Sequence, residues 1–300
     1  MAFAEQSAAL ADVVAIPVTP YDADGGVARG TYRALLRRLL DHGVRTVTPN
    51  GNTGEFYALD PAERRLVVEL TMAEADPGTQ VVAGVGLDLP TAVAAARHAR
   101  DAGAGAVMVH QPVHPYVSPE GWVDYHRAIA DSVPELGVVP YVRDAALEGG
   151  PIGRLGELCP NVIGVKYAVP DPARFAAVAR DAGLDRFTWV TGLAELYAPA
   201  HWAVGATGFT SGLVNVAPRV SLEMLRALRD GDFAAAMKVW EQVREFEDLR
   251  AEGRSANNVS VVKEALAAQG RCRRDVRPPS HPLPEDRRAR VATLVAGWDL

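Results

Sequence analysis

NVIGVKY, residues 161–167, is a short apolar run that carries a lysine near its end and lies between two proline-containing turns. Its length and its bounds predict a buried strand. Alternation along that strand places Val162, Gly164 and Lys166 on one face. An ammonium group at the end of a buried strand is costly unless it is paired, and burial lowers its pKa and favours the neutral amine. A neutral amine is a nucleophile that condenses with a carbonyl to form a Schiff base.

Lysine is rare in this chain. Its 31 basic residues comprise 28 arginines and only three lysines, at positions 166, 238 and 263. Since arginine serves wherever a surface cation is enough, each lysine calls for a specific reason. Lys166 is therefore a candidate catalytic amine. The alternative is an ordinary strand-end lysine whose ammonium reaches solvent.

On both sides of this strand, apolar runs alternate with amphipathic helices. The predicted strands are 12–17, 45–48, 81–85, 106–109, 138–141, 161–167, 187–191 and 206–210. The predicted helices are 32–42, one that starts near residue 60, 91–102, 119–132, 152–158, 172–182, 195–204 and one that starts at residue 218. Eight strand-then-helix units predict an α/β fold, a (β/α)8 TIM barrel with a closed parallel sheet. A doubly wound open sheet is the alternative, but the chain contains neither GxGxxG nor GxxxxGK[ST].

The residues after the barrel pattern read as a C-terminal helical extension. Amphipathic periodicity predicts further helices over 232–250 and 257–268. The arginine-rich segment 271–290 also carries prolines and acidic residues, and we expect it to be a solvated tail. We therefore predict a catalytic barrel domain over residues 1–230 and an extension over residues 231–300 that docks on the barrel or on a neighbouring subunit.

Composition and charge argue against several kinds of partner. A net charge of −6 disfavours nucleic acid, which requires a basic face. No apolar run approaches the ~20 residues of a membrane span, and residues 1–10 do not have the pattern of a signal peptide. Cys159 and Cys272 are too few for a disulfide framework or a metal knuckle. We expect a cytoplasmic protein that needs no metal and no organic cofactor.

Further candidate residues follow from the position of the reactive groups in a parallel barrel, at the C-terminal ends of the strands. Tyr141 ends the fifth predicted strand, next to Lys166, and the loop NGNTGE, residues 50–55, follows the second. The glycines of this loop let the backbone turn and expose N–H groups that suit a carboxylate. An amine, a phenol and an anion-binding turn are what an enzyme acting on a 2-keto acid requires. The loop as a plain turn, and Tyr141 as a core aromatic, remain the alternatives. Pro140 donates no ladder hydrogen bond, so we expect strand pairing to end before it.

Six segments carry a family resemblance in the same order along the chain. They are IPVTP at 16–20, GNTGE at 51–55, Tyr141, GVK at 164–166, residues 205–218 and VKEAL at 262–266. With these segments the chain resembles the dihydrodipicolinate synthase / N-acetylneuraminate lyase superfamily of class I aldolase-like lyases. The resemblance covers nearly the whole chain and implies a (β/α)8 barrel with a helical C-terminal extension, usually a homotetramer, with a dimer as the alternative.

The resemblance also implies roles for individual residues. Lys166 would form the Schiff base, and Tyr141, helped by Thr53, would carry protons. Gly51, Asn52 and Thr53 would form the turn that binds the substrate carboxylate through N–H groups. The other residues implied in the 2-keto acid pocket are Gly192 and Thr210, and Lys263 would be structural.

Several residues depart from the dihydrodipicolinate synthase pattern. The turn carries Asn52 where the synthase has a threonine, His114 takes the place of its second tyrosine, and Ala146 takes the place of an arginine for its second substrate. These departures make lysine biosynthesis an unfavoured function. His110 and His114 could assist proton transfer near neutral pH, or they could be ordinary polar loop residues. They form no metal site, because no third ligand follows at a suitable spacing.

Two motifs are more similar to the 5-dehydro-4-deoxyglucarate dehydratase branch. They are GNTGEF at 51–56 and YVRD at 141–144. In that branch Arg143 could bind a sugar-acid carboxylate, for which a planar fork is suited. The alternative is a surface arginine that bonds Asp144 or Glu148.

The sequence therefore predicts a Schiff-base-forming lyase that acts on a small 2-keto acid. It would dehydrate a deoxy-keto sugar acid, or cleave or form a carbon–carbon bond next to the ketone. Lys166 would supply the imine. A non-catalytic keto-acid-binding barrel is the alternative from another class; Asn52 and His114 favour it, and Lys166 with Tyr141 disfavour it. A phosphate-sugar isomerase is disfavoured, because no phosphate loop follows the last two strands.

Overall fold

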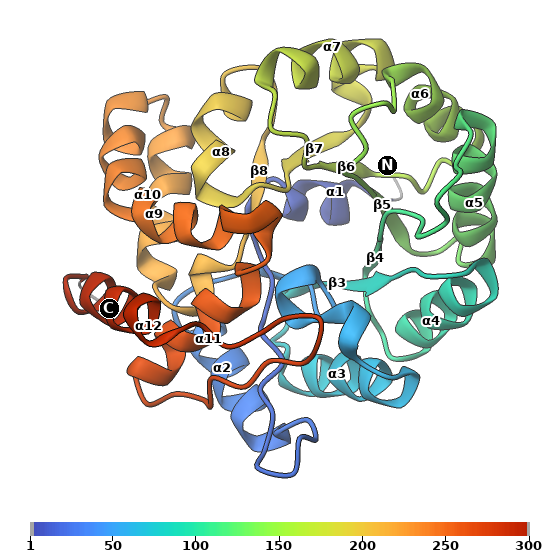
Figure 1. The fold of residues 1–300 in the computed structure, drawn as a ribbon. Helices are drawn as coiled ribbons and strands as arrows, with labels where there is room; N and C mark the ends of the chain where they lie inside the picture. The colour runs from blue at the N-terminus through green and yellow to red at the C-terminus, as the bar shows by residue number, and fades with distance from the viewer. Residues whose placement is uncertain (1–2, 299–300) are drawn as a thin grey trace.

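The computed structural model describes residues 3–298 and shows a closed barrel of eight parallel strands (Figure 1). The strands are β1 Val13–Ala15, β2 Thr46–Val47, β3 Gln80–Val85, β4 Ala106–Val109, β5 Gly137–Val142, β6 Gly164–Tyr167, β7 Thr188–Thr191 and β8 Gly208–Ser211. Each strand pairs with the next one along the chain, and β8 pairs with β1. The prediction of a TIM barrel is confirmed. The extreme ends of the two predicted domains, residues 1–2 and 299–300, lie outside the described residues.

A ring of helices covers the barrel. They are α2 Arg29–Asp41, α3 Pro61–Glu74, α4 Leu89–Asp101, α5 Pro119–Ser132, α6 Gly149–Leu158, α7 Pro172–Ala182, α8 Ala194–Trp202 and α9 Pro218–Arg229. Local chemistry fixes where several of them begin. The α3 helix starts with proline, and the side chain of Asp60 accepts a hydrogen bond from the N–H of Glu63 (2.8 Å) while Glu63 bonds back to the Asp60 N–H (3.0 Å). This capping box satisfies two N–H groups that a helix start would leave unpaired.

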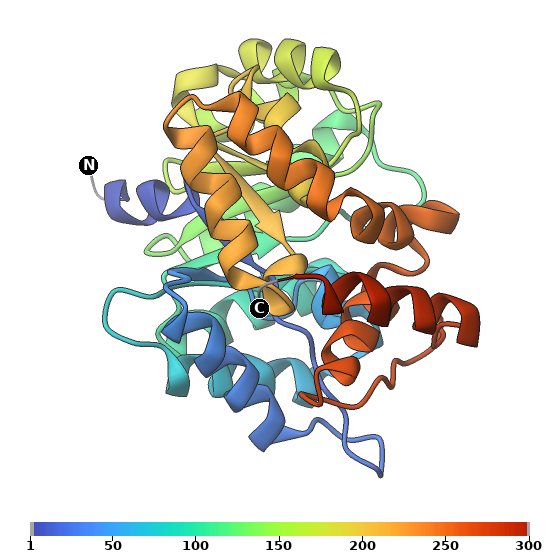
Figure 2. The same cartoon turned by 90° about the vertical axis from the view of Figure 1, so that its left-hand side faces the viewer.

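A short helix that the sequence pattern did not predict, α1 Ala4–Leu10, closes the N-terminal end of the barrel. Leu10 lies in the inner apolar cluster of the barrel, and the hydroxyl of Ser7 bonds that of Thr188 at the start of β7 (2.8 Å). Figure 2 shows α1 at one end of the molecule and the red C-terminal helices at the other. The C-terminal ends of the strands lie at the end of the barrel opposite to α1, where we expect the functional site.

Two strand predictions need correction. Val162 lies in the cluster between barrel and helices and Ile163 in the inner cluster, so Val162 does not share a face with Lys166. The reason is that regular pairing of β6 begins only at Gly164, and alternation does not extend back through the preceding turn. Pairing also continues past Pro140, which is opposite Val109 within β5. A proline removes one N–H, and the residues after it remain paired with β6.

The C-terminal extension consists of α10 Phe233–Ser255, α11 Asn258–Ala268 and α12 Glu285–Ala296. The α10 helix packs on α8 and α9, and α11 packs against the loop after β2 (Figure 1). The expectation of a solvated tail over 271–290 is wrong. Arg277 makes two 2.6 Å bonds to Glu63 of the barrel, and α12 begins at Glu285 and buries Val291. The predicted boundary at residue 230 falls in the turn between α9 and α10, and the division into two domains stays a prediction. Within residues 3–298, no helix is both long enough and apolar enough to cross a membrane.

Candidate active site

Lys166 is buried inside the barrel near the C-terminal end of β6, with 4% of its surface exposed. Its Nζ lies 4.0 Å from the centroid of the Tyr141 ring and 3.6 Å from the Met108 sulfur. No carboxylate pairs with it among residues 3–298. Burial, and then the positive charge of Arg143, lower the pKa of Lys166 to about 7. A large share of this amine is therefore neutral near pH 7, and the alternative of a solvated lysine is excluded.

Tyr141 is the direct partner of Lys166 in the pairing of β5 with β6. The side-chain amide of Asn52 donates to the Tyr141 hydroxyl oxygen (3.3 Å). Because that oxygen is the acceptor, the phenol proton stays free to be donated to a ligand. Burial raises the pKa of Tyr141 to about 12, so the phenol is protonated at neutral pH.

The loop after β2 contains two short 3₁₀ turns, η1 Asn52–Gly54 and η2 Phe56–Ala58. Gly51 is required here, because a Cβ atom at this position would lie 2.4 Å from the Ile16 side chain. The N–H groups of Asn52 and Thr53 have no acceptor among the described residues, whereas those of the next three residues are bonded within the loop. Free N–H groups in a tight turn form a suitable site for a carboxylate.

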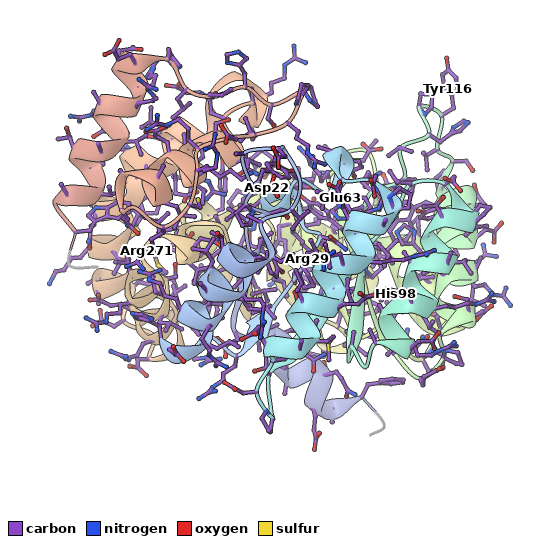
Figure 3. The ribbon with its side chains drawn as sticks, turned by 90° about the horizontal axis from the view of Figure 1, so that it is seen from below. Asp22, Arg29, Glu63, His98, Tyr116 and Arg271 are labelled. Atoms are coloured by element: carbon purple, nitrogen blue, oxygen red, sulfur yellow. The ribbon has the colours of Figure 1, made fainter. Side chains whose placement is uncertain are left out.

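A cavity of about 570 Å³ brings most of the predicted residues together. It is lined by Asn52, Thr53, Tyr141, Arg143, Lys166, Gly192 and Thr210. Gly51 packs closely against the Ile16 side chain and does not line the cavity. His114 lies outside it, on an exposed loop where its Nδ1 contacts the Tyr116 carbonyl oxygen at 2.8 Å; Figure 3 shows Tyr116 pointing away from the barrel at the tip of this loop. The individual roles of these residues stay predictions.

His110 was left open between proton transfer near neutral pH and a polar loop residue, and its surroundings argue against the first. Its ring is fully buried and stacks on Phe56 at 4.0 Å, and its Nε2 bonds the Asn50 carbonyl oxygen at 2.8 Å. Burial lowers the pKa of His110 to about 3, so the ring is neutral over the whole physiological range. The histidine acts as a support for the loop after β2.

The C-terminal extension supplies cavity residues that sequence reasoning missed. They include Glu247, Arg250, Arg254, Asn258 and Ser280. One signal was present in the sequence: Gly253-Arg254-Ser255 interrupts a helical pattern, as glycine and serine do where a helix is broken. The pattern does not say that this break faces the barrel mouth.

Comparison with known proteins settles the family. A family model described as the dihydrodipicolinate synthetase family matches residues 9–297. The chain belongs to this family. Membership makes it a lyase of the kind that processes keto acids through a lysine imine.

Several relatives and solved structures resemble this chain over nearly its whole length. A protein of Saccharopolyspora erythraea named probable 5-dehydro-4-deoxyglucarate dehydratase is 33% identical over 94% of this chain and 92% of its own length. A crystal structure of dihydrodipicolinate synthase from Bacillus clausii is 37% identical, with a TM-score of 0.94 over 98% of this chain and 100% of the other. The E. coli K12 prophage protein YagE, solved in complex with pyruvate, is 28% identical, with a TM-score of 0.86 over 95% of this chain and 97% of its own.

The burial of Lys166 predicts how imine formation depends on pH. We expect the rate at low pyruvate concentration to rise between pH about 6 and about 8 and then to level off, because the nucleophilic amine becomes the major form in this range. The measurement mixes protein and pyruvate at each pH and quenches the mixture into borohydride at one fixed pH. A rate that keeps rising toward pH 10 would mean that the amine is as basic as a solvated lysine.

Gly192 leaves no room for a side chain next to the catalytic lysine. A Cβ at this position would lie 2.8 Å from the Ala168 Cβ and 3.1 Å from the Lys166 Cε. We expect Gly192→Ala to displace the amine and to slow imine formation by about 10²-fold, since small misplacements of reacting groups have effects of this size. The matched control is Gly150→Ala, where nothing lies within 4 Å of the new methyl group and the rate should not change. Equal rates for the two variants would contradict the packing described.

Proposed function

We propose that this protein forms a Schiff base between Lys166 and the ketone of a 2-keto acid and uses it to break a bond at the neighbouring carbon. One observation carries the proposal: the Lys166 amine is buried, has no carboxylate partner among the described residues, and faces the Tyr141 ring at 4.0 Å in a cavity of about 570 Å³. A lysine that is not needed for an ion pair, and whose neutral form is favoured by burial, is suited to nucleophilic catalysis.

The chemistry can be assigned to residues that line the cavity. The neutral amine of Lys166 attacks the ketone carbon, and loss of water leaves an imine. The protonated imine withdraws electrons from the adjacent carbon, so that a C–H or C–C bond there can break. The Tyr141 phenol, oriented by Asn52, would donate and recover protons with the help of the Thr53 hydroxyl. The free N–H groups of Asn52 and Thr53 would hold the carboxylate next to the ketone.

Dehydration of an acidic deoxy-keto sugar is the reaction we favour. Support comes from relatives about one-third identical that are named probable 5-dehydro-4-deoxyglucarate dehydratase, and from Arg143 at the cavity. Among the described residues, Arg143 has no ion pair with Asp144 or Glu148. Its guanidinium is therefore available to bind a ligand in the cavity. Dihydrodipicolinate synthesis is the second candidate, favoured by the 37% identical structure of that name. Asn52, His114 and Ala146 argue against it.

We also propose that the protein is a cytoplasmic homo-oligomer, a tetramer or a dimer. Large apolar side chains are exposed at two separate places, the loop that carries Val113 (55% exposed) and Tyr116 (85%), and the start of α10 with Phe233 (39%) and Met237 (40%). Exposed aromatic and aliphatic groups of this kind commonly mark contacts between subunits. Light scattering should give a mass of two or four times 32.0 kDa, and a monomer at micromolar concentration would contradict the proposal.

Reductive trapping tests the chemistry directly. With pyruvate and borohydride, we expect one adduct per chain, and peptide mapping should place it on Lys166. The scarcity of lysine makes this mapping clean, because the other two are the exposed Lys238 and the fully buried Lys263. An adduct on Lys238 alone would show non-specific labelling and would contradict the proposed function. Incubation with a panel of keto acids, with product analysis, separates a lyase from a barrel that only binds its ligand.

A further inference from the structure

Three arginines come together on the outside of the barrel, around the 3₁₀ turn η4 Leu213–Asn215 that follows β8. They are Arg38 of α2, Arg219 in the first turn of α9, and Arg271, three residues after the end of α11 (labelled in Figure 3). None of the three has an ion-pair partner among residues 3–298, and none lines the catalytic cavity. Arg38 is half-buried, whereas Arg219 and Arg271 are exposed.

Two backbone carbonyl groups bring Arg38 and Arg271 to the same place. The Nη1 of Arg38 donates to the Asn215 carbonyl oxygen (2.9 Å), and its Nη2 donates to that of Val216 (3.2 Å). The side-chain amide of Gln269 donates to the same Val216 oxygen (3.4 Å), and its own oxygen accepts from the Arg271 Nε (2.9 Å). Arg38 and Arg271 are therefore both oriented by contacts that meet at one carbonyl group.

The backbone that carries these carbonyl groups is fixed from within the protein. The Asn215 side chain is buried and donates to the carbonyl oxygens of Ile16 (2.8 Å) and Gly212 (2.9 Å), and it accepts from the Val18 N–H (3.1 Å). A rigid support lowers the entropy that the arginines would lose when a ligand binds between them.

Arg219 adds a third guanidinium group at the start of a helix. Pro218 is the first residue of α9, no side chain caps this end, and the Arg219 N–H donates to no backbone oxygen among residues 3–298. The first turn of a 12-residue helix carries a partial positive charge, which adds to that of the side chains.

The three positive charges oppose one another. Burial, and then the charges of Arg271 and Arg219, lower the pKa of Arg38 to about 10, so Arg38 is still charged at pH 7. No carboxylate of the described residues acts on Arg38, because Asp41, one turn further along α2, pairs with Arg37. An anion bound between the arginines would remove this repulsion.

We propose that Arg38, Arg219 and Arg271 form a binding site for a phosphate group, separate from the catalytic cavity. A single guanidinium is enough for a planar carboxylate, whereas a tetrahedral phosphate dianion accepts hydrogen bonds from several directions at once and suits three arginines beside a helix start. A net charge of −6 disfavours nucleic acid, so the phosphate would be a free ion or part of a small metabolite. The site does not depend on the chemistry proposed for Lys166.

Protection from an arginine reagent tests the site. The whole protein is treated with phenylglyoxal in about 10 mM inorganic phosphate, or in potassium chloride of equal ionic strength, and the modification rate of each arginine is read by peptide mass spectrometry. For a dissociation constant of about 1 mM, we expect phosphate to slow the modification of Arg219 and Arg271 by about tenfold. Arg154, exposed on α6, is the internal control and should react equally fast in both salts.

A second ligand distinguishes the two sources of phosphate. Glucose 6-phosphate replaces inorganic phosphate at the same concentration. Stronger protection by the ester would assign the site to a phosphorylated metabolite, and weaker protection would assign it to the free ion. Either result supports a phosphate site.

Two variants then show whether the arginines act together. In Arg271→Gln, we expect the protection of Arg219 by phosphate to fall from about tenfold to about twofold, and Arg219→Gln should do the same to Arg271. Both substitutions are at exposed positions, so the fold should persist. Arg38 is left in place because it also bonds two carbonyl groups. Arg154→Gln is the matched control and should keep the full protection of Arg219 and Arg271.

Three results would overturn the site. The first is equal modification of Arg219 and Arg271 in phosphate and in chloride. The second is equal slowing at Arg154, which would show an effect of phosphate on the reagent. The third is protection confined to Arg143 and Arg254, which would place the phosphate in the catalytic cavity. Trapping of pyruvate on Lys166 is a separate measurement, and its failure would leave the phosphate site standing.

Discussion

Replacing Lys166 with methionine is expected to abolish imine formation and to lower turnover by about 10⁴-fold or more, as removal of a covalent nucleophile does. The fold should remain intact. Methionine has a similar length and no charge, and the space that it enters is lined by Met108 and the Tyr141 ring. The control is Lys238→Met on the exposed face of α10, which should keep full activity. Labelling of the Lys166→Met variant by pyruvate at the wild-type rate would contradict the mechanism.

Lys166→Arg should be as inactive as Lys166→Met, but its folded state should be less stable. A guanidinium remains charged where the native amine readily becomes neutral, and the site offers it no carboxylate among the described residues. We expect this variant to lose about 3 kcal/mol or more of its free energy of unfolding relative to Lys166→Met, the size of an uncompensated buried charge. Urea unfolding of the two variants measures the difference. Equal stabilities would mean that water or an unseen anion solvates the site.

The parts of this molecule that the sequence predicted are those set by local pattern. Eight apolar runs that alternate with helical periodicity were sufficient to predict the barrel. The order of strands in such a barrel then placed Tyr141 next to Lys166, and the two residues are direct partners in the pairing of β5 with β6. The loop after β2 was recognised from its two glycines, which the structure requires for close packing against Ile16 and Pro17, whereas the left-handed residues of the loop are Asn50 and Glu55. Each of these inferences uses residues that are close in sequence, or elements whose order around the barrel follows from the topology.

The features that were not predicted depend on contacts between segments that are distant in the sequence. No periodic pattern in a single sequence reveals such contacts. Arg250 reaches the cavity because α10 packs against the barrel, and Arg254 follows it at a break in α10 that begins at Glu252. The sequence left the role of His110 open, and its burial against Phe56 follows from how the loops after β2 and β4 pack. Arg277 was assigned to a solvated tail because its charged neighbours look like a surface segment, whereas Glu63 of α3 provides its partner.

Lys263→Met is the second substitution for which we expect a large effect, here on stability. The Lys263 ammonium is fully buried, bonds Glu55 and the Asp275 carbonyl oxygen (2.8 Å), and lies 4.0 Å from the Tyr21 ring centroid. Its removal leaves the buried Glu55 carboxylate with the N–H of Arg277 (2.9 Å) but without its cation. Breaking a buried ion pair in this way costs about 3–5 kcal/mol. The surface pair of Arg290 with Glu245 provides the control, and Arg290→Met should leave the unfolding midpoint nearly unchanged.

The same substitution should also weaken substrate binding, because Glu55 belongs to the turn that carries Asn52 and Thr53. Glu55 is itself left-handed (φ 60°), and its hold on α11 and the tail keeps this strained turn in place. We therefore expect a raised KM for the keto acid in Lys263→Met at temperatures where the protein is still folded.

Glu55→Gln should reduce the stability less than Lys263→Met, because burial already lowers the pKa of Lys263 and favours the neutral amine once the carboxylate is gone. In a double-mutant cycle, Lys263→Met with Glu55→Gln should be more stable than the sum of the single effects, since no charge is left unpaired. Strict additivity would show that the pair does not hold the C-terminal extension to the substrate-binding loop.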